Sequence, residues 1–313
     1  MSIAGSLLIA MLIEGVVSWP VRLHAIVGHP VTWLGRLIAT LERWFNRDDF
    51  SETSRKLAGV VVAFFTIALA GGIAWAIAHL LPGSVVGMVL VGLLAWPLIA
   101  SRSMYDHVAA VAEPLVRGNL GDARAAVAMI VGRDPNQLDG SGITRAALES
   151  LAENTSDGII APLFWGLLLG LPGIAAYKAI NTLDSMIGHR TLRYEAFGWA
   201  AARIDDVANL VPARLTGLLF VLVSGRPLAA WRCMLRDARQ HRSPNAGWPE
   251  AAMAGALGVR LSGPRAYEGG VSDEPWLNAD ARDAEAADLD RGMVVYLRAM
   301  ILLAVILAIL AAI

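Results

Sequence analysis

Cysteine, charge and recognisable nucleotide-binding motifs are scarce in this chain of 313 residues. The single cysteine, Cys233, excludes an intramolecular disulfide and a thiolate metal cluster within one chain, and it is most simply a packing residue. Charged residues make up only 17% of the sequence, and the formal net charge of -1 indicates no bulk attraction to nucleic acid. Neither a phosphate-binding loop ending in Gly-Lys-Ser or Gly-Lys-Thr nor a Gly-x-Ser-x-Gly elbow occurs. Any nucleotide would therefore bind in an unfamiliar way.

Apolar residues dominate the composition. They make up 56% of the sequence, well above their usual share in soluble domains. The 30 glycines and 14 prolines favour helices that pack closely and break, because so apolar a chain does not stay unfolded. We predict an all-α fold: a polytopic membrane helical bundle with broken or re-entrant segments and cytoplasmic helical elaborations, forming a single integral membrane domain over residues 1–313.

Long apolar runs place the predicted membrane spans. The first run carries Glu14 and lacks a basic leader and a small-residue cleavage site, so we do not expect a signal peptide. Prolines and glycines interrupt residues 159–177, and Pro212 and Arg214 interrupt residues 207–223, which predicts two broken or re-entrant segments. The candidate spans are residues 2–19, 57–81, 85–100, 159–177, 207–223 and 293–313.

Basic residues predict the orientation of these spans. The cations between Arg22 and Lys56 make the first loop cytoplasmic and the N-terminus external. The cations between Lys178 and Arg203 would then lie outside if residues 159–177 crossed the membrane once, and re-entrant segments remove that conflict. We expect a multi-pass protein of the cell membrane, inner or plasma, whose polar motifs face the cytoplasm or a cavity open to it.

One stretch of the chain places acids, amides and cations beside apolar segments. Polar groups at bilayer depth are costly unless they face a cavity, a partner or an ion, so this concentration predicts a functional site. The residues are Glu153, Asn154, Asp157, Lys178, Asn181, Asp184, Arg203, Asp205, Asp206, Asn209 and Arg214.

Carboxylates recur in this stretch at helical spacing. Glu149, Glu153 and Asp157 lie four residues apart and share one face of a helix. Together with Asp205 and Asp206 they supply oxygen ligands of the kind that Mg²⁺ prefers when it also binds substrate phosphates. For any single acid, an ion pair with a nearby cation is an equally good explanation. The whole set, beside apolar segments, favours the site.

Amides and cations complement these acids. Four cations suit phosphate or carboxylate groups, and arginine offers a bidentate fork: Lys178, Arg193, Arg203 and Arg214. Snorkelling to the membrane interface is the alternative for each, most credible for Arg193. The amides are Asn154, Asn181 and Asn209.

Aromatic and basic side chains follow the first apolar run. His29, Trp33 and Arg36 lie within eight residues, and the indole and the guanidinium suit stacking on a flat ligand. An interfacial anchor is an equally good interpretation of Trp33.

Two other stretches are predicted to be surface helices. Residues 109–133 have an alanine-rich, charge-dotted pattern, and residues 280–290 are acidic and alanine-rich. We expect the second stretch to be a solvated helix.

Several long blocks of sequence, in order, resemble the CobD/CbiB family, the adenosylcobinamide-phosphate synthases of cobalamin biosynthesis. The resemblance covers nearly the whole chain and is far more specific than one short motif. The blocks are HPVTWLGRLI at 29–38, ESLAENTSDGIIAPLFW at 149–165, YKAINTLDSMIGHR at 177–190, RIDDVANLVPARLT at 203–216, SPNAGWPEAAMAGALGV at 243–259 and GPRAY at 263–267.

The resemblance implies an amide ligation. Family members attach an aminopropanol unit, usually (R)-1-amino-2-propanol phosphate, to the propionate carboxylate of adenosylcobyric acid, with ATP as co-substrate. The partners it implies are this corrinoid, the amine and the lipid bilayer, with no nucleic acid. A homo-oligomer or contacts with other corrin-pathway enzymes stay open.

This chemistry suggests a role for each candidate. A carboxylate is a poor electrophile, so amide formation calls for an acyl phosphate, a metal ion and cations around phosphoryl oxygens. Glu153 is assigned as a ligand or as the base that deprotonates the amine. Mg²⁺ binding is assigned to Asp157, Asp184, Asp205 and Asp206, and phosphate binding to Lys178, Arg203 and Arg214. Orientation of ligands or substrate amides is assigned to Asn154, Asn181 and Asn209. Contact with the corrin ring is assigned to His29, Trp33 and Arg36.

Departures from the family pattern are few. Trp165 stands where tyrosine is expected, and His189 replaces an aromatic or basic residue. Two other functions remain open: a Mg²⁺-dependent membrane transferase acting on a diphosphate substrate, and a corrinoid-binding or transport component.

Overall fold

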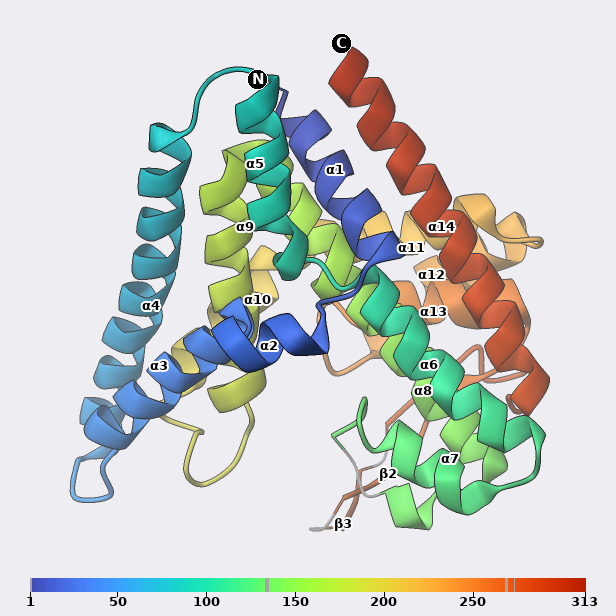
Figure 1. Ribbon diagram of the computed structural model, residues 1–313. Helices are drawn as coiled ribbons and strands as arrows, with labels where there is room; N and C mark the ends of the chain where they lie inside the picture. The colour runs from blue at the N-terminus through green and yellow to red at the C-terminus, as the bar shows by residue number, and fades with distance from the viewer. Residues whose placement is uncertain (1, 133–134, 268–269, 273) are drawn as a thin grey trace. The chain divides into compact units, whose positions relative to one another are not determined.

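The computed structural model describes residues 2–132, 135–267, 270–272 and 274–313. The described chain is predominantly helical (Figure 1), so the all-α prediction is confirmed. Its strands are short and form two antiparallel pairs, β1 (Leu261–Ser262) with β4 (Trp276–Leu277) and β2 (Arg265–Tyr267) with β3 (Gly270–Ser272).

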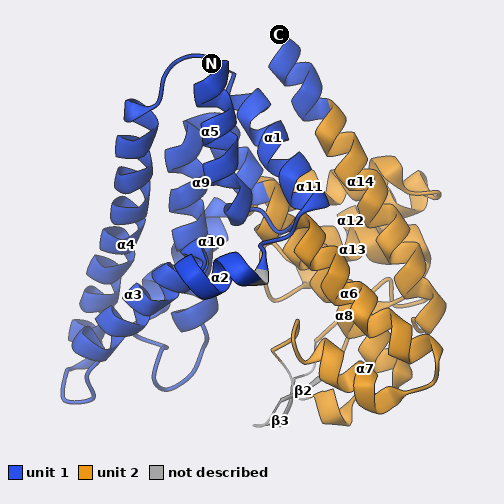
Figure 2. Cartoon of the chain, viewed as in Figure 1, with its two compact units in different colours: residues 1–100, 161–209, 306–313 blue, residues 101–160, 210–305 orange. Residues whose placement is uncertain are grey.

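The chain divides into two compact units, coloured separately in Figure 2. Unit 1 comprises residues 1–100, 161–209 and 306–313, and unit 2 comprises residues 101–160 and 210–305. Both units contain discontinuous stretches of chain, so their local packing depends on residues distant in sequence. The assignment of residues 1–313 to a single domain stays a prediction.

Each unit has its own set of helices. Unit 1 contains α1 (Ile3–Val16), α2 (Val21–Val27), α3 (Pro30–Phe45), α4 (Glu52–Leu80), α5 (Val85–Ala95), η1 (Trp96–Leu98), α9 (Ala161–Ile187) and α10 (Trp199–Ala208). Unit 2 contains α6 (Ser101–Val116), α7 (Leu120–Val127), η2 (Pro135–Gln137), α8 (Gly140–Thr155), the π-helix η3 (Ser156–Ile160), α11 (Leu210–Val223), α12 (Pro227–Asp237), η4 (Ala238–Gln240), α13 (Gly247–Leu257) and most of α14 (Ala286–Ala312).

Apolar helical segments make this a multi-pass membrane protein. Within the described residues, four are long and apolar enough to cross a membrane: Glu52–Leu80, Val85–Val116, Gly140–Ile187 and Ala286–Ala312. The pair α10 and α11 passes the same test but bends by 46° at its break, which fits the predicted re-entrant segment. The run predicted at 2–19 forms the 14-residue helix α1, a shorter apolar helix.

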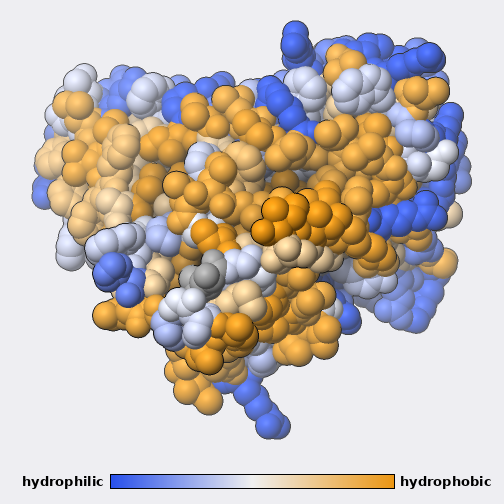
Figure 3. Space-filling view, turned by 90° about the horizontal axis from the view of Figure 1, so that it is seen from above, coloured by the Kyte–Doolittle hydropathy of each residue, from blue (hydrophilic) through white to orange (hydrophobic). Residues whose placement is uncertain are grey.

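Exposed apolar side chains mark surfaces suited to lipid. On α4, Val61, Phe64 and Trp75 are each more than half exposed, although the helix is strongly apolar. Figure 3 shows apolar side chains spread over much of the face in view. In water such a surface would favour aggregation, whereas lipid tails solvate it without penalty.

The core of unit 1 forms where α3, α4, α9 and α10 pack together. Ile38, Val62, Leu183 and Phe197 are buried in one cluster contributed by these elements and the loop before α10. The Trp165 indole donates to the carbonyl of Ala208 over 3.1 Å, which ties α9 to the end of α10. These contacts hold the polar side chains of α9 and α10 on a fixed hairpin.

Helix α9 is broken where the sequence predicted an interruption. Gly170 has φ 69° and ψ -153°, a conformation that favours glycine, and Pro172 follows without a backbone N–H to donate. The helical hydrogen-bond ladder therefore cannot continue undisturbed through this point. The broken segment at 159–177 is confirmed at Gly170.

Unit 2 corrects the expectation for residues 280–290. The helix begins only at Ala286, and the Asp288 carboxylate is buried rather than solvated. It accepts from Arg282 and Arg291 and also from the backbone N–H of Glu285, which is how an acid caps the first turn of a helix. The prediction was therefore wrong for the start of the helix and for Asp288. The other acids of the run are exposed as expected: Asp280, Asp283, Glu285 and Asp290.

The lone cysteine has the packing role predicted for it. Cys233 is buried on α12, with its Sγ 3.5 Å from a carboxylate oxygen of Asp237. Burial, together with that carboxylate, raises the pKa of the Cys233 thiol to about 12. A thiol with this pKa stays protonated and is a poor nucleophile.

Candidate functional site

Helices α9 and α10 gather most of the predicted site residues of unit 1. Both helices belong to one hairpin, and α9 presents a polar stripe that starts near its middle and runs to its C-terminal end. The predicted residues on this hairpin are Lys178, Asn181, Asp184, Arg203, Asp205, Asp206 and Asn209.

Asp184 lies where a negative charge needs compensation. It is in the last turn of α9, and the C-terminal end of a helix carries a partial negative charge. Its carboxylate interacts electrostatically with Asp206, also an acid, and with His189 and Arg203. Arg203 in turn bonds Asp206 over 2.8 Å. Two acids near a helix C-terminus, with Arg203 as the neighbouring arginine, form a place that favours a further cation.

A buried chain of hydrogen bonds fixes Asp205. The Asn209 amide donates to Asp205 Oδ2 over 3.0 Å, and the Tyr177 hydroxyl donates to Asn209 Oδ1 over 2.9 Å. Asn209 and Tyr177 are each 1% exposed, so these groups act on Asp205 rather than on a ligand. Sequence reasoning missed Tyr177, although its position one turn before Asn181 on the polar stripe was a usable signal.

Lys178 and His29 form a second polar centre in unit 1. Lys178 is buried on α9, and His29 precedes α3, where its Nδ1 accepts the backbone N–H of Val31 over 3.2 Å. The His29 ring meets Trp19 edge to face at 5.2 Å. Burial, followed by the electrostatic effects of Lys178 and His24, lowers the pKa of His29 below its ordinary value, which favours the neutral ring at pH 7. His29 thus caps α3 as an acceptor.

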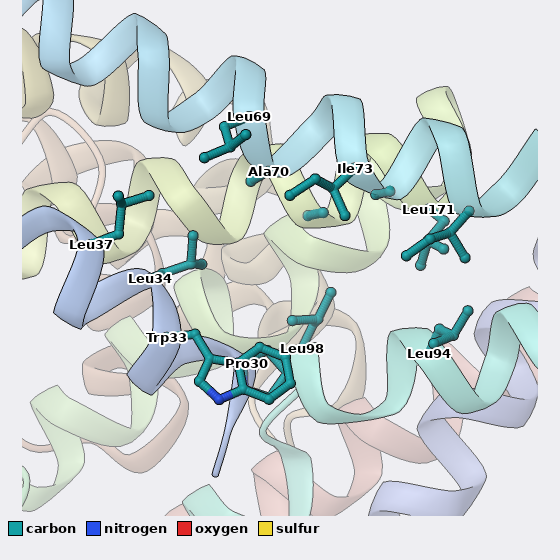
Figure 4. Close-up of a pocket in the computed structure, with 13 residues that line it drawn as sticks. Pro30, Trp33, Leu34, Leu37, Leu69, Ala70, Ile73, Leu94, Leu98 and Leu171 are labelled. Carbon is teal, nitrogen blue, oxygen red and sulfur yellow. The ribbon is translucent and has the colours of Figure 1, made fainter. Parts of the chain in front are cut away.

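Trp33 stands at the edge of an apolar groove between α3, α4, α9 and the α5–η1 region (Figure 4). Its indole N–H donates to the carbonyl of Val27 over 3.0 Å, so the ring is held in place. In Figure 4 Leu34 of α3 lies across a gap from Leu69 and Ile73 of α4. The groove encloses about 280 Å³ and is lined almost entirely by carbon. Arg36 is exposed on α3.

The predicted residues of unit 2 surround a π-helical turn. Glu153 and Asn154 are exposed in the last turn of α8, and Asp157 is half-buried in η3. The Asn154 amide donates to the Ser150 carbonyl over 2.9 Å. A π-turn adds a residue to the helical repeat and is frequent at functional sites. It also changes the angle around the helix axis that separates the side chains of Glu153 and Asp157.

Glu149, the first acid of that predicted face, has a structural role. Its Oε1 accepts the backbone N–H of Ser262 over 2.7 Å, 113 residues away, and lies 3.8 Å from Arg145. The buried carboxylate thereby anchors β1 to α8. Arg214 of α11 lies over the Trp248 ring at 4.4 Å, which fixes its guanidinium without using all of its donors.

Two pairs of titratable side chains outside the predicted set include buried groups. In unit 2, His241 and Glu250 are both buried, with Nε2 and Oε1 3.7 Å apart. In unit 1, Arg193 bonds the buried Glu42 over 2.8 Å. The partners of each pair are separated along the chain, by 151 residues for Arg193 and Glu42. The spacing of residues along the sequence therefore could not predict the Arg193–Glu42 ion pair.

The donor set of the α9–α10 hairpin fits a hard cation only in part. Asp184, Asp205 and Asp206 offer carboxylate oxygens, with Asn181 nearby on α9. Among the described residues, no group of three or more His, Cys, Asp or Glu is arranged to hold a metal ion unaided. Mg²⁺ commonly binds through one or two carboxylates plus substrate phosphates. The Mg²⁺ assignment, which also includes Asp157 of unit 2, stays a prediction.

Fold and site together define a class: multi-pass helical membrane proteins with acids and cations concentrated on a helical hairpin. The family model described as CobD/Cbib protein matches residues 7–296. A relative from Rhodobacter capsulatus is 61% identical over 300 residues, which cover 96% of this chain and 95% of the relative. This chain belongs to the CobD/CbiB family.

Other relatives extend this comparison. One from Brucella suis is 46% identical over 307 residues, covering 94% of this chain and 93% of the relative. One from Geobacter metallireducens is 45% identical over 266 residues, covering 82% of each. These relatives, like that of Rhodobacter capsulatus, are called cobalamin biosynthesis protein CobD. No solved structure matches the chain significantly.

Proposed function

We propose that this protein acts in cobalamin biosynthesis as an adenosylcobinamide-phosphate synthase. It would join (R)-1-amino-2-propanol phosphate, or free aminopropanol, to the propionate carboxylate of adenosylcobyric acid through an amide bond. Family membership supports the pathway. The observation that carries the reaction is the α9–α10 hairpin, where Asp184 and Asp206 lie beside Arg203 at a helix C-terminus.

The reaction needs the charges that this hairpin supplies. Phosphoryl transfer from ATP to the propionate carboxylate gives an acyl phosphate and ADP. The amine then attacks the acyl carbon, the C–O bond to phosphate breaks, inorganic phosphate leaves and the amine loses a proton. Phosphoryl oxygens carry negative charge throughout, so Lys178, Arg203 and a cation held by the acids would stabilise both steps.

Individual residues take distinct roles in this scheme. Asp184, Asp205 and Asp206 of unit 1 would hold Mg²⁺, which supplies positive charge to phosphoryl oxygens. The role of Asp157 of unit 2 as a ligand stays a prediction from the sequence. Asn209 acts through Asp205, because its amide is hydrogen-bonded to that carboxylate and to Tyr177. The exposed Glu153 is the proposed acceptor of the amine proton. The proposed phosphate contacts are Lys178, Arg203 and Arg214, and the proposed substrate-orienting amides are Asn154 and Asn181.

The groove beside Trp33 is the proposed contact for the corrin. A corrin ring combines a broad apolar surface with amide edges, and the groove offers an apolar wall with one fixed indole. His29 precedes the same helix, α3, with a lowered pKa that favours the neutral ring, and Arg36 is exposed further along it. Aromatic faces stack on flat ligands, and arginine reaches amide oxygens.

An omission assay tests the proposed function. Membranes containing the protein receive adenosylcobyric acid, aminopropanol phosphate, Mg²⁺ and ATP, with each component left out in turn, and the corrinoid product is weighed by mass spectrometry. We expect the mass of cobinamide phosphate only in the complete mixture. Turnover of a lipid diphosphate without nucleotide would favour the transferase, and corrinoid binding without turnover would favour a carrier or a missing partner.

Labelling tests the proposed orientation in the cell membrane. The loop around His189 joins α9 to α10 and should face the cytoplasm if the hairpin is re-entrant. A cysteine placed at His189, in a Cys233→Ala background, should react with an impermeant maleimide only in inverted vesicles. Reaction in intact cells would contradict a cytoplasmic site.

A further inference from the structure

A second pocket in the molecule combines charge with apolar walls. It lies within unit 2, where the start of α12, the end of α13 and the first half of α14 meet, and encloses about 320 Å³. We call it the arginine pocket. Its lining includes Arg226, Asp290, Arg291, Val294, Val295 and Arg298.

Positive charge in this pocket is only partly neutralised. Arg291 bonds Asp288 over 2.7 Å and the carbonyl of Leu257 over 3.0 Å, so its guanidinium is fixed in place. Neither Arg226 nor Arg298 forms an ion pair with a carboxylate in the described part of the chain. Asp290 is the opposing charge in the lining. The pocket therefore presents more cation than anion.

Gly258 makes room for one of these cations. It ends α13 with φ 70°, a left-handed conformation. A Cβ at this position would lie 2.2 Å from Nη1 of Arg226, so the guanidinium occupies the space that a side chain would need. The Arg226 backbone N–H donates to Ser224 Oγ over 3.2 Å, which fixes the start of α12. Local backbone geometry thus positions Arg226 in the pocket.

The arginine pocket lies where α14 enters the apolar part of the membrane. Arg298 is the last charged residue of the chain, and α14 passes the length and hydropathy test for a membrane span. Arginines at such a boundary lie at the depth of lipid headgroups. Val294, Ile301 and Val305 are 45%, 66% and 48% exposed and share a helical face with Arg298. An apolar stripe therefore leads from the pocket along α14.

We propose that the arginine pocket binds the phosphate of an anionic phospholipid, with an acyl chain lying on this stripe of α14. Paired and unpaired guanidinium groups suit a phosphodiester, and the walls formed by Val294 and Val295 suit the glycerol and the first methylenes. A free phosphate ion would use the arginines but neither the apolar wall nor the stripe. The proposal is independent of the reaction that the protein catalyses.

Native mass spectrometry of the full-length protein in detergent tests the proposal. Phosphatidylglycerol and phosphatidylcholine with identical chains are titrated separately, with inorganic phosphate and glycerol phosphate as soluble competitors. The test variant combines Arg226→Gln with Arg298→Gln. The control is Arg232→Gln, because Arg232 is also exposed on α12 but does not line the pocket. Circular dichroism checks that both variants fold.

We expect wild-type protein and the Arg232 control to prefer phosphatidylglycerol. The double variant should bind it about 25-fold more weakly, since each arginine near the membrane surface contributes about fivefold. Equal binding of the two lipids by wild-type protein would overturn the proposal even if the double variant did not fold. Unchanged binding by a folded double variant, or displacement of the lipid by millimolar soluble phosphate, would overturn it as well.

Discussion

Asp184 and Asp206 of unit 1 have different surroundings from three buried acids of unit 2. In unit 2, Glu149, Asp237 and Asp288 lie apart, and each accepts a backbone N–H and lies beside an arginine. In unit 1, Asp184 and Asp206 interact with each other at a helix C-terminus. Acids that stabilise a fold are neutralised one at a time, whereas adjacent acids cost stability and persist where a site needs them.

Asp237 shows how complete the neutralisation is in unit 2. Burial disfavours its charge, but hydrogen bonds from Arg236 and from the backbone N–H of Asn278 hold the pKa of Asp237 below its ordinary value. The Asn278 side chain also donates toward the carbonyls of Ala254 and Val259. A carboxylate with these hydrogen bonds stabilises the fold and has little hydrogen-bonding capacity left for a substrate.

The largest effect should follow replacement of an acid in the unit 1 cluster. Asp184→Asn removes one of two interacting carboxylates while keeping the side-chain shape. We expect product formation to fall at least about 100-fold, or about 2.7 kcal/mol in activation free energy. The unfolding temperature should stay level or rise, because a like-charge repulsion is lost. Parallel turnover and scanning-fluorimetry measurements would show this, and full activity would remove Asp184 from the site.

The reverse pattern is expected for an acid of unit 2. Asp288→Asn weakens bonds from two exposed arginines and from the Glu285 N–H, which should lower stability by about 2 kcal/mol. Activity per folded molecule should be unchanged. The control is Asp106→Asn, whose partner Arg102 is exposed and whose ion pair should contribute little. A stable Asp288 variant would contradict its structural role.

A smaller effect on both properties is expected at Tyr177. Tyr177→Phe leaves the Asn209 carbonyl oxygen without its hydroxyl donor and loosens Asp205. We expect a loss of about 1 kcal/mol in stability and about tenfold in turnover, typical of a residue that positions another. The turnover loss should appear as a lower kcat with little change in KM. A change in KM alone would assign Tyr177 to substrate binding instead.

The smallest effect concerns pH. The pKa of His29 is lowered in the folded protein, so the unfolded chain takes up a proton first as the pH falls below about 6.5. Stability should therefore decline as the pH falls below that value, by at most about 1.4 kcal/mol per pH unit. His29→Asn keeps a capping side chain without a titrating group and should flatten this decline. The measurement is the unfolding temperature of wild type and variant at each pH below about 6.5. Identical slopes of unfolding temperature against pH would exclude His29 as the group responsible.

Hydropathy predicted the long apolar helices because it is a local property. The apolar run at 57–81 forms α4 up to Leu80, and the run at 293–313 forms α14 up to Ala312. Local signals also predicted the break at Gly170, where glycine and proline act on their own backbone. The π-turn at 156–160 was missed, since it depends on how the helix packs rather than on a residue type.

Site residues were harder to separate from structural ones. Glu149 matched the spacing of Glu153 and Asp157, yet its partner Ser262 is 113 residues away. Asp288 looked solvated because an acidic, alanine-rich pattern is the same for a surface helix and for a capped core helix. Residue type and spacing predict which positions on a helix face are polar. Contacts with residues distant in the sequence decide which of these side chains remain available to bind a ligand.

The most direct test of this account is turnover per folded molecule for Asp184→Asn and Asp288→Asn in one membrane preparation. We predict a split: the first variant loses activity and keeps its unfolding temperature, and the second loses stability and keeps its activity. If both lose activity only in proportion to their folded fraction, the acids of α9 and α10 are structural and the proposed reaction site is wrong.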